Sequence, residues 1–221
     1  AAVAARHGLT PAHVVAGCGS VAVLAHVLEA FCDAGDEVVH AWRSFEAYPI
    51  AIALQGAVGV PVPLTDDGRH DLPAMAAAVG PRTRVVLVCT PNNPTGPAVR
   101  ADELTAFLDA VPSDVLVVVD EAYVEFVRDP AAASGTAVLA GRENVVVLRT
   151  FSKAYGLAGL RVGYALAAPD VAAAVRKAAT PFGVNHLAEV AALASLEAEA
   201  ALAERVDAVV AERVRVVAGL R

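Results

Sequence analysis

The sequence predicts an α/β protein with three layers, in which helices cover both faces of a mostly parallel β-sheet. Two observations predict this fold class. Short runs of valine and leucine alternate with longer segments of helical spacing, and the runs are apolar at every position. Strands of that kind are typical of parallel sheets that are buried on both faces. With 221 residues, 57% of them hydrophobic, the chain is long enough for one sizeable buried core.

The expected elements follow one another without a linker or an internal repeat. Residues 1–6 are expected to be the end of a helix that Gly8 closes. In the first long helix, Leu24, Val27 and Phe31 recur at helical spacing. Up to residue 110, we expect strands at residues 13–16, 37–40, 58–62 and 85–89, and helices at 20–34, 48–54, 72–79 and 102–110.

The second part of the chain continues this alternation and then becomes helical. We expect strands at residues 115–120, 144–149 and 162–166, and a helix at 171–179. Beyond Pro181, a helical pattern begins near Leu187 and continues to Arg221 without a cap. We therefore expect a large domain over residues 1–185, and over 186–221 a long helix that leads into a smaller C-terminal domain. That small domain would be largely absent, so the chain is expected to be a fragment, or the ordered part, of a longer protein.

Composition excludes several classes of protein. A net charge of −7 and the lack of a basic run argue against nucleic-acid binding. No uncharged apolar run reaches membrane-span length and the N-terminus does not resemble a signal peptide, so we expect a cytoplasmic protein without membrane contact. Cys18, Cys32 and Cys89 form no close pair and are expected to be reduced. The six histidines have no metal-ligand spacing, so no metal site is predicted.

One of the two lysines, Lys153, has an unusual setting. It follows the apolar run 144–149, so it lies beyond the carboxyl end of a strand, where open α/β sheets bind their ligands. Thr150 and Ser152 precede it, and Arg161 follows eight positions later. A lysine near apolar walls and a second cation loses its proton readily and can form a Schiff base with a carbonyl. Because hydroxyl groups and an arginine bind phosphate, this combination indicates pyridoxal 5'-phosphate (PLP).

Two further strand ends fit the same cofactor. The run 115–120 ends in Asp120, whose carboxylate would keep a pyridine nitrogen protonated and make the ring an electron sink. Tyr123 follows three residues later and could direct its phenol at the ring hydroxyl. The run 85–89 leads into a turn fixed by proline and glycine, where the amide of Asn93 could donate to that hydroxyl as well. Three strands are thus expected to deliver an amide, an acid and a lysine to one edge of the sheet.

These motifs resemble the signature series of the fold-type I PLP-dependent aminotransferases. The similarity lies in Pro-Asn-Asn-Pro-Thr-Gly at 91–96, in Asp-Glu-Ala-Tyr at 120–123 and in the segment 152–161. The surrounding residues, including 157–164, are similar to the histidinol-phosphate aminotransferase group, and aromatic amino acid aminotransferases share them. The resemblance runs in the right order from about Val14 to the end of the chain.

The resemblance implies a role for each motif residue. Lys153 would bind PLP covalently, Asp120 would pair with the ring nitrogen, and Asn93 and Tyr123 would contact the ring hydroxyl. Of these, Lys153, Asp120 and Tyr123 are the predicted catalytic residues. The predicted phosphate contacts from the lysine loop are Ser152, Arg161 and Thr150.

The glycine-rich segment 17–22 allows two interpretations. It matches the dinucleotide pattern G-x-G-x-x-A, which would favour an NAD-linked dehydrogenase, but Asp36 precedes the second strand, whereas a ribose-binding acid should close it. In a PLP enzyme, the N–H groups at the start of the following helix bind the phosphate. The resemblance favours this second use, with contacts from Gly19, Ser20 and Val21.

Two aromatic residues follow the second strand. The resemblance places the ring of Phe45 against the pyridine face, where stacking would fix the tilt of the cofactor; the alternative is that Phe45 only packs in the core. Tyr48 is expected to line the substrate pocket.

As a whole, the resemblance implies a homodimeric transaminase that moves an amino group between histidinol phosphate or an aromatic amino acid and 2-oxoglutarate. Phe45 and Phe182 favour aromatic donors. No residue after Arg161 can be matched to the arginine that binds the substrate carboxylate in this group. A related fold-type I decarboxylase or lyase, or a non-catalytic PLP-binding regulatory domain, would share nearly all of these residues.

Overall fold

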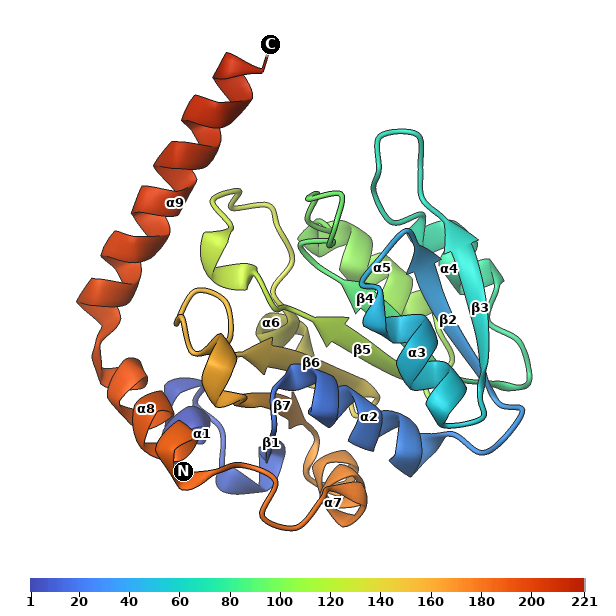
Figure 1. Ribbon diagram of the computed structural model, residues 1–221. Coiled ribbons are helices and arrows are strands. Elements are labelled where there is room, and N and C mark those ends of the chain that lie inside the picture. Colours follow the sequence, from blue (N-terminus) through green and yellow to red (C-terminus); the bar gives the residue numbers. More distant parts are fainter. Residues whose placement is uncertain (221) are drawn as a thin grey trace.

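The computed structural model describes residues 1–220. Over these residues, one sheet with the strand order β1-β7-β6-β5-β4-β2-β3 is covered by helices on both faces, as predicted (Figure 1). Its strands are β1 (Val14–Gly17), β2 (Glu37–Trp42), β3 (Val58–Pro63), β4 (Thr83–Cys89), β5 (Leu116–Asp120), β6 (Val145–Thr150) and β7 (Gly163–Ala167). The helices are α1 (Ala2–Arg6), α2 (Ser20–Phe31), α3 (Ala47–Leu54), α4 (Leu72–Ala77), α5 (Ala101–Ala110), α6 (Gly135–Leu139), α7 (Pro169–Ala178), α8 (His186–Glu197) and α9 (Glu199–Gly219).

The sheet is parallel from β3 through β2, β4 and β5 to β6, and β7 runs antiparallel to both of its neighbours, β6 and β1. The parallel register pairs Cys89 with Asp120 and Asp120 with Leu148. Because the carboxyl ends of parallel strands meet at one edge, the segments that follow β4, β5 and β6 lie together there.

Two apolar cores separate the layers. On one face α2, α3 and α7 pack against the sheet, and on the other face α4, α5, α6 and α8 do so. Successive strand residues point to opposite faces, so Val118 of β5 lies in the first core and Val119 in the second. This explains why the strands are apolar at every position.

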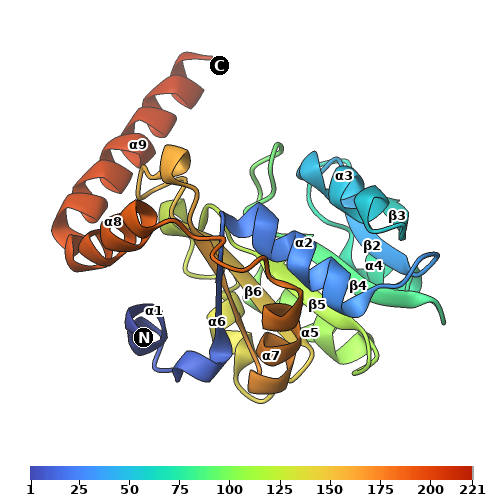
Figure 2. The same ribbon diagram turned by 60° about the horizontal axis from the view of Figure 1, so that its bottom comes forward.

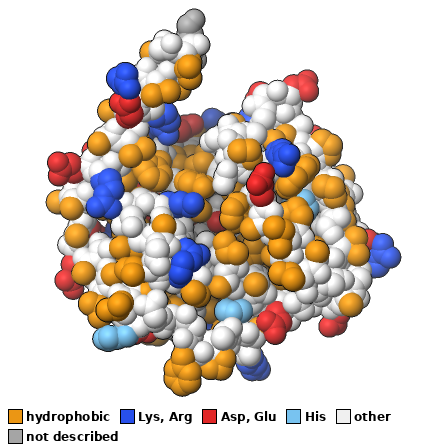
Figure 3. All heavy atoms as spheres, in the orientation of Figure 1, with side chains coloured by type: hydrophobic (Ala, Val, Ile, Leu, Met, Phe, Trp, Pro, Cys, Tyr) orange, Lys and Arg blue, Asp and Glu red, His pale blue; other side chains and the backbone are white. Residues whose placement is uncertain are grey.

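The last predicted helix is in fact two helices. The backbone leaves the helical conformation at Ala198, with φ −94° and ψ 44°, and α9 then runs in a new direction away from the sheet (Figures 1 and 2). Neither glycine nor proline marks this break, so the sequence pattern did not reveal it. The predicted end of that helix, Arg221, lies outside the described residues. In the space-filling view, α9 presents hydrophobic side chains beside charged ones (Figure 3).

The domain boundary predicted at residue 185 remains a prediction. Ala188 and Ala192 of α8 belong to the same core as the sheet, whereas α9 exposes Val209, Val214 and Val217. Within residues 1–220, none of the helices combines the length and the apolar character needed to cross a membrane.

The start of α2 lies directly against β7. A Cβ atom added to Gly163 would be 2.4 Å from the backbone nitrogen of Ser20 and 3.0 Å from the carbonyl oxygen of Arg149. Only glycine allows such a close approach between two backbones. The first turn of α2 is thereby held at the same sheet edge as the ends of β5 and β6.

Candidate active site

A cavity of about 190 Å³ lies at the carboxyl ends of the parallel strands. Of the residues predicted to bind the cofactor, all except Gly19 line it. The complete lining is Ser20, Val21, Phe45, Cys89, Asn93, Asp120, Ala122, Tyr123, Thr150, Ser152, Lys153 and Arg161. Sequence reasoning did not assign Cys89 and Ala122 to the site, although each is a direct neighbour of the predicted strand-end positions.

Asp120 forms the floor of the cavity. Its Oδ2 atom accepts a hydrogen bond of 2.8 Å from the hydroxyl of Tyr48, while its Oδ1 atom is buried and has no hydrogen-bond partner among the described residues. Burial raises the pKa of the Asp120 carboxyl to about 6, and hydrogen bonding from Tyr48 and then from the Ala122 backbone opposes this rise. A buried acceptor without a donor is costly, so Oδ1 fits a ligand that brings a donor, such as a protonated ring nitrogen.

Tyr48 itself is not on the cavity wall. It was expected to line a substrate pocket, but its side chain is 1% exposed and lies in the core on the α2 and α3 face. The spacing that places Tyr48 in α3 gave no indication of its partner, which lies 72 positions further along the chain.

The lysine lies opposite this floor. The Lys153 Nζ atom is 5.4 Å from the centre of the Tyr123 ring, within the range of a cation–π contact. The Lys153 side chain is exposed, although the cavity that it lines also contains the apolar side chains of Val21, Phe45 and Ala122. The Asn93 Nδ2 atom donates to the Tyr123 hydroxyl at 3.3 Å, and both groups face the cavity.

Beside the floor and the lysine, the cavity has a cationic corner formed by Arg161. Arg161 has a left-handed backbone with φ 57°, and its Nη1 atom donates to the Ser152 hydroxyl at 3.3 Å and to the Ala158 carbonyl at 2.8 Å. The Thr150 hydroxyl accepts from the backbone N–H of Ser152 at 3.0 Å, which fixes the loop between them. A Cβ atom on Gly19 would lie 2.5 Å from Arg161 Nη2, so the guanidinium occupies the space that a side chain there would fill.

The first turn of α2 completes this corner. Gly19 is its N-cap, with φ 86° and no capping side chain. The N–H groups of the first turn have no partner within the helix, and they carry the positive end of the helix dipole. Together with Arg161 and the hydroxyl of Ser20, they form a binding site that suits a phosphate group.

Phe45 was predicted either to stack on the cofactor or only to pack in the core, and its position is compatible with both. It lines the cavity, and it also packs against the core, edge-on to Tyr48 with ring centres 5.6 Å apart. Its stacking on a cofactor ring stays a prediction.

Buried polar contacts anchor the loops that carry these side chains. The Asn92 amide nitrogen donates to the Arg43 carbonyl at 3.1 Å and to the Thr95 hydroxyl at 2.8 Å, and its oxygen accepts from Ser44 at 2.7 Å. Asn92 therefore ties the loop before Phe45 to the turn that holds Asn93.

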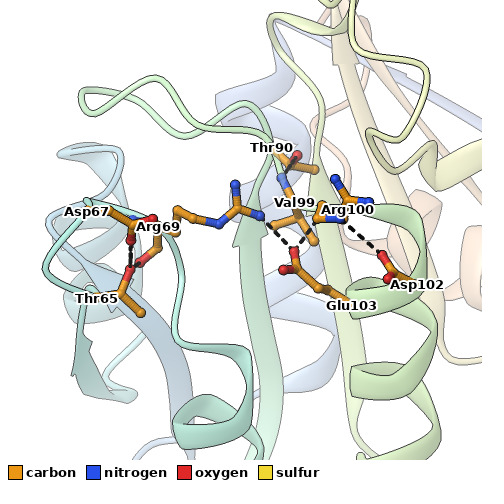
Figure 4. A network of polar contacts seen from close by, with 8 residues as sticks. All are labelled: Thr65, Asp67, Arg69, Thr90, Val99, Arg100, Asp102 and Glu103. Carbon is orange, nitrogen blue, oxygen red and sulfur yellow. Dashed lines mark hydrogen bonds and ion pairs between the residues drawn. The ribbon is translucent and has the colours of Figure 1, made fainter.

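A second contact closes the base of that turn. The Thr90 hydroxyl accepts from the Val99 N–H at 2.9 Å, so the residues between them form a closed loop (Figure 4). Next to it, Glu103 at the start of α5 accepts from Arg69 at 2.8 Å (Figure 4). The turn is thus held at its base, in addition to the contacts of Asn92.

The cavity fits PLP in the nature and order of its groups. A buried acceptor lies on the floor, two hydrogen-bonding side chains and an amine lie at the side, and the cationic corner lies at the carboxyl-terminal edge of the sheet. A larger hollow of about 640 Å³ shares Asn93 and Tyr123 with the cavity and is lined further by Phe126, Val209 and Arg213. It leaves room for a second molecule beside the cavity.

Comparison with known proteins finds similarity along the whole chain. The profile of the family described as aminotransferase class I and II matches residues 1–221. Aromatic amino acid aminotransferase of Streptomyces avermitilis is 60% identical over 216 residues, which are 98% of this chain and 60% of that protein. The enzyme of the same name from Thermobifida fusca is 57% identical over 220 residues, which are 100% of this chain and 61% of that protein. The chain thus spans about 60% of the length of these curated relatives.

Solved structures show the same fold. Histidinol-phosphate aminotransferase from Sinorhizobium meliloti in complex with pyridoxal-5'-phosphate has a TM-score of 0.91 and 35% identity, covering 97% of this chain and 58% of that one. L-threonine-O-3-phosphate decarboxylase from Porphyromonas gingivalis has a TM-score of 0.77 and 29% identity, covering 88% of this chain and 59% of that one.

Proposed function

Because the chain belongs to the class I and II aminotransferases, PLP-dependent enzymes of fold type I, we propose that it takes part in transamination between an aromatic amino acid and 2-oxoglutarate. The observation that carries this proposal is the buried, unpartnered Oδ1 atom of Asp120 in the same cavity as Lys153 and Arg161. The family match also removes the NAD-linked interpretation of the segment 17–22.

Bound PLP would supply a reactive aldehyde and a ring that accepts electrons. Asp120 would hold a proton on the ring nitrogen through Oδ1, because a cation there relieves the cost of the buried carboxylate. Asn93 and Tyr123 would donate to the ring hydroxyl. Arg161, Ser152 and the first turn of α2 would bind the phosphate, and Phe45 would limit the tilt of the ring.

Lys153 has two tasks in this proposal. Its Nζ atom would bind the cofactor covalently, and after an amino donor displaces it, the free amine would remove the proton from the donor's α-carbon. Nζ lies 5.4 Å from the ring of Tyr123, and Tyr123 also lines the adjoining hollow, from which the donor would enter.

The choice of an aromatic donor rests on the relatives. Curated proteins named aromatic amino acid aminotransferase are 54 to 60% identical to the chain, whereas solved histidinol-phosphate aminotransferases are 21 to 35% identical. Phe126 and Val209 give the adjoining hollow an apolar lining that suits an aromatic ring. A homodimeric, cytoplasmic enzyme is part of the proposal through the family resemblance.

The cofactor link is tested by borohydride reduction of the PLP-loaded protein, followed by peptide mapping. We expect a pyridoxyl adduct on Lys153 and none on Lys177, the other lysine of the chain. Lys153→Ala should abolish both the adduct and the turnover, while Lys177→Arg serves as the matched control. An adduct at Lys177 alone would contradict the assignment.

A panel of donors tests the substrate. Phenylalanine and tyrosine should give the corresponding 2-oxo acids with 2-oxoglutarate, with a higher kcat/KM than histidinol phosphate. The decarboxylase alternative has support from the Porphyromonas gingivalis structure. Release of carbon dioxide from phenylalanine or tyrosine, with no formation of the corresponding 2-oxo acid, would favour that alternative over transamination.

A further inference from the structure

A buried hydrogen bond joins Asp120 to Tyr48, a residue outside the motifs that carry the family resemblance. The two side chains are 1% and 5% exposed, and the tyrosine hydroxyl lies 2.8 Å from Oδ2. Tyr48 comes from the first turn of α3, and Asp120 from the end of β5. The contact therefore connects a helix of one outer layer to the catalytic edge of the sheet.

The ring of Tyr48 is fixed by neighbouring aromatic side chains. Phe45 meets it edge-on with centres 5.6 Å apart, and His40 does so at 6.4 Å. Both contacts are of the edge-to-face kind that stabilises aromatic pairs. The Tyr48 hydroxyl is thus held in place. The hydrogen bond forms only when the Asp120 carboxylate is oriented towards that hydroxyl.

The protonation states around this contact favour a permanent donor. Burial, and then the Asp120 charge, raise the pKa of Tyr48 well above its usual value, so its proton stays on the hydroxyl. Burial also lowers the pKa of His40 and raises that of Cys89 to about 12, so both remain neutral near pH 7. The other charged groups that act on Asp120 are Glu121, which raises its pKa, and Lys153, which lowers it.

We propose that Tyr48 is a positioning residue, which holds Oδ2 of Asp120 so that Oδ1 remains turned into the cavity for the ring nitrogen of PLP. The destination of Oδ1 rests on the proposed function; the orientation of the carboxylate does not. The outer torsion of an aspartate side chain is broad and roughly two-fold. The Tyr48 hydroxyl on Oδ2 limits that freedom. The backbone N–H of Ala122 also acts on the carboxyl, but it does not replace the hydrogen bond to Oδ2, so without Tyr48 the carboxylate can turn away from a ligand.

The first test uses the cofactor-free protein and therefore does not depend on turnover. Tyr48→Phe keeps the aromatic ring and removes the donor. Because a hydrogen bond to the charged form lowers a carboxyl pKa, ¹³C NMR should find the pKa of Asp120 raised by about one unit in the variant. The matched control is Tyr164→Phe, which removes another buried hydroxyl, bonded to His7 at 3.0 Å. That control should leave the Asp120 pKa unchanged.

The second test asks whether Tyr48 acts through Asp120. Tyr48→Phe should weaken PLP binding roughly tenfold, as expected for the loss of one hydrogen bond to a charged group. In the Asp120→Asn background, the same substitution should have little effect, because the group that Tyr48 positions is no longer charged. Equal losses in both backgrounds would mean that Tyr48 only supports the core.

The outcomes separate the two proposals. An Asp120 pKa that is the same in the wild-type protein and in Tyr48→Phe overturns the positioning role, whatever the protein does with PLP. If wild-type Lys153 acquires no pyridoxyl adduct, the proposed function fails, and the NMR result still decides whether Tyr48 orients the carboxylate.

Discussion

Arg149 donates to one oxygen of Glu121 through two nitrogens, Nε at 2.9 Å and Nη2 at 2.7 Å. The other carboxylate oxygen accepts from the backbone N–H of Gly135 at 2.6 Å, and the Glu121 side chain is fully buried. Glu121 directly follows Asp120, and Arg149 directly precedes Thr150. This ion pair therefore joins the two strand ends that bring the acid and the lysine loop to the site.

Loss of the ion pair should destabilise the fold. Glu121→Gln removes the carboxylate that is paired with Arg149, leaving only the charge of Glu125 near it in the described part of the chain, and breaking a buried pair in this way costs about 3 to 5 kcal/mol. Urea unfolding should show a free energy of unfolding lower by that amount. Asp207→Asn is the control, because its pair with Arg128 is exposed, and it should have a much smaller effect. Similar losses in the two variants would show that the buried pair has no special role.

The charge of Asp120 should cost stability in the absence of PLP. Burial raises its pKa from 3.8 to about 6, so its contribution to stability is present below pH 3.8 and is lost as the pH rises through about 6. Asp120→Asn should therefore be more stable than the wild type above pH 6, by about 3 kcal/mol at most. This advantage should shrink as the pH falls towards 4.

Urea unfolding of the cofactor-free proteins at several pH values measures this difference. A gap that is independent of pH would contradict the raised pKa. With PLP bound, the same substitution should retain the cofactor and lose most of the turnover. Unchanged turnover would argue against a role for the carboxylate in holding the ring nitrogen protonated.

The opposite pH dependence is expected from His7. Burial, and then the nearby Arg149 and Arg6, lower its pKa from 6.5 to about 4. Its contribution to stability is therefore present above pH 6.5 and is lost as the pH falls towards 4. His7→Gln, which cannot become charged, should lose less stability than the wild type over this range. His186→Gln is the exposed control, and its urea midpoints should follow those of the wild type at each pH.

PLP binding should depend on the several N–H donors of the Arg161 guanidinium as well as on its charge. Arg161→Lys keeps the charge but cannot reproduce the contacts to Ser152 and Ala158 that place the guanidinium next to Gly19. We expect PLP to bind roughly tenfold to a hundredfold more weakly. Arg176→Lys, on α7 and bonded to the Ala12 and Val14 carbonyls, should bind PLP as the wild type does. A titration that finds equal affinities for both variants would remove Arg161 from the phosphate site.

The strands and the edge where they converge could be predicted from the sequence because each signal is local. The apolar run before Asp120 fixes a strand, and the acid at its end fixes where a polar side chain emerges. The same reasoning places Asn93 and Lys153 beyond the ends of their strands. The assignment of Phe45 and of the first turn of α2 needed the family resemblance in addition.

Pairings across the chain could not be predicted. Nothing in the helical spacing of α3 specifies that Tyr48 reaches Asp120, since that contact depends on the position of the helix along the sheet. Two adjacent acids at the end of β5 were a usable signal, because neighbouring strand residues face opposite ways and Glu121 therefore needed a partner of its own. The break at Ala198 was missed because alanine is the best helix former, so the local preference opposed the structure.

The contact at Gly163 has a consequence for the depth at which a phosphate can bind. The backbone of the first α2 turn packs against β7 at Gly163. The space there fits the hydrogen atom of glycine but not a Cβ atom. Any side chain at this position would lift the helix start from the strand and carry the anion-binding groups with it, while Asp120 stayed in place. The distance between the first turn of α2 and Asp120 thus depends on Gly163, which does not line the cavity. Gly163 lies in β7, the strand that is antiparallel to both of its neighbours.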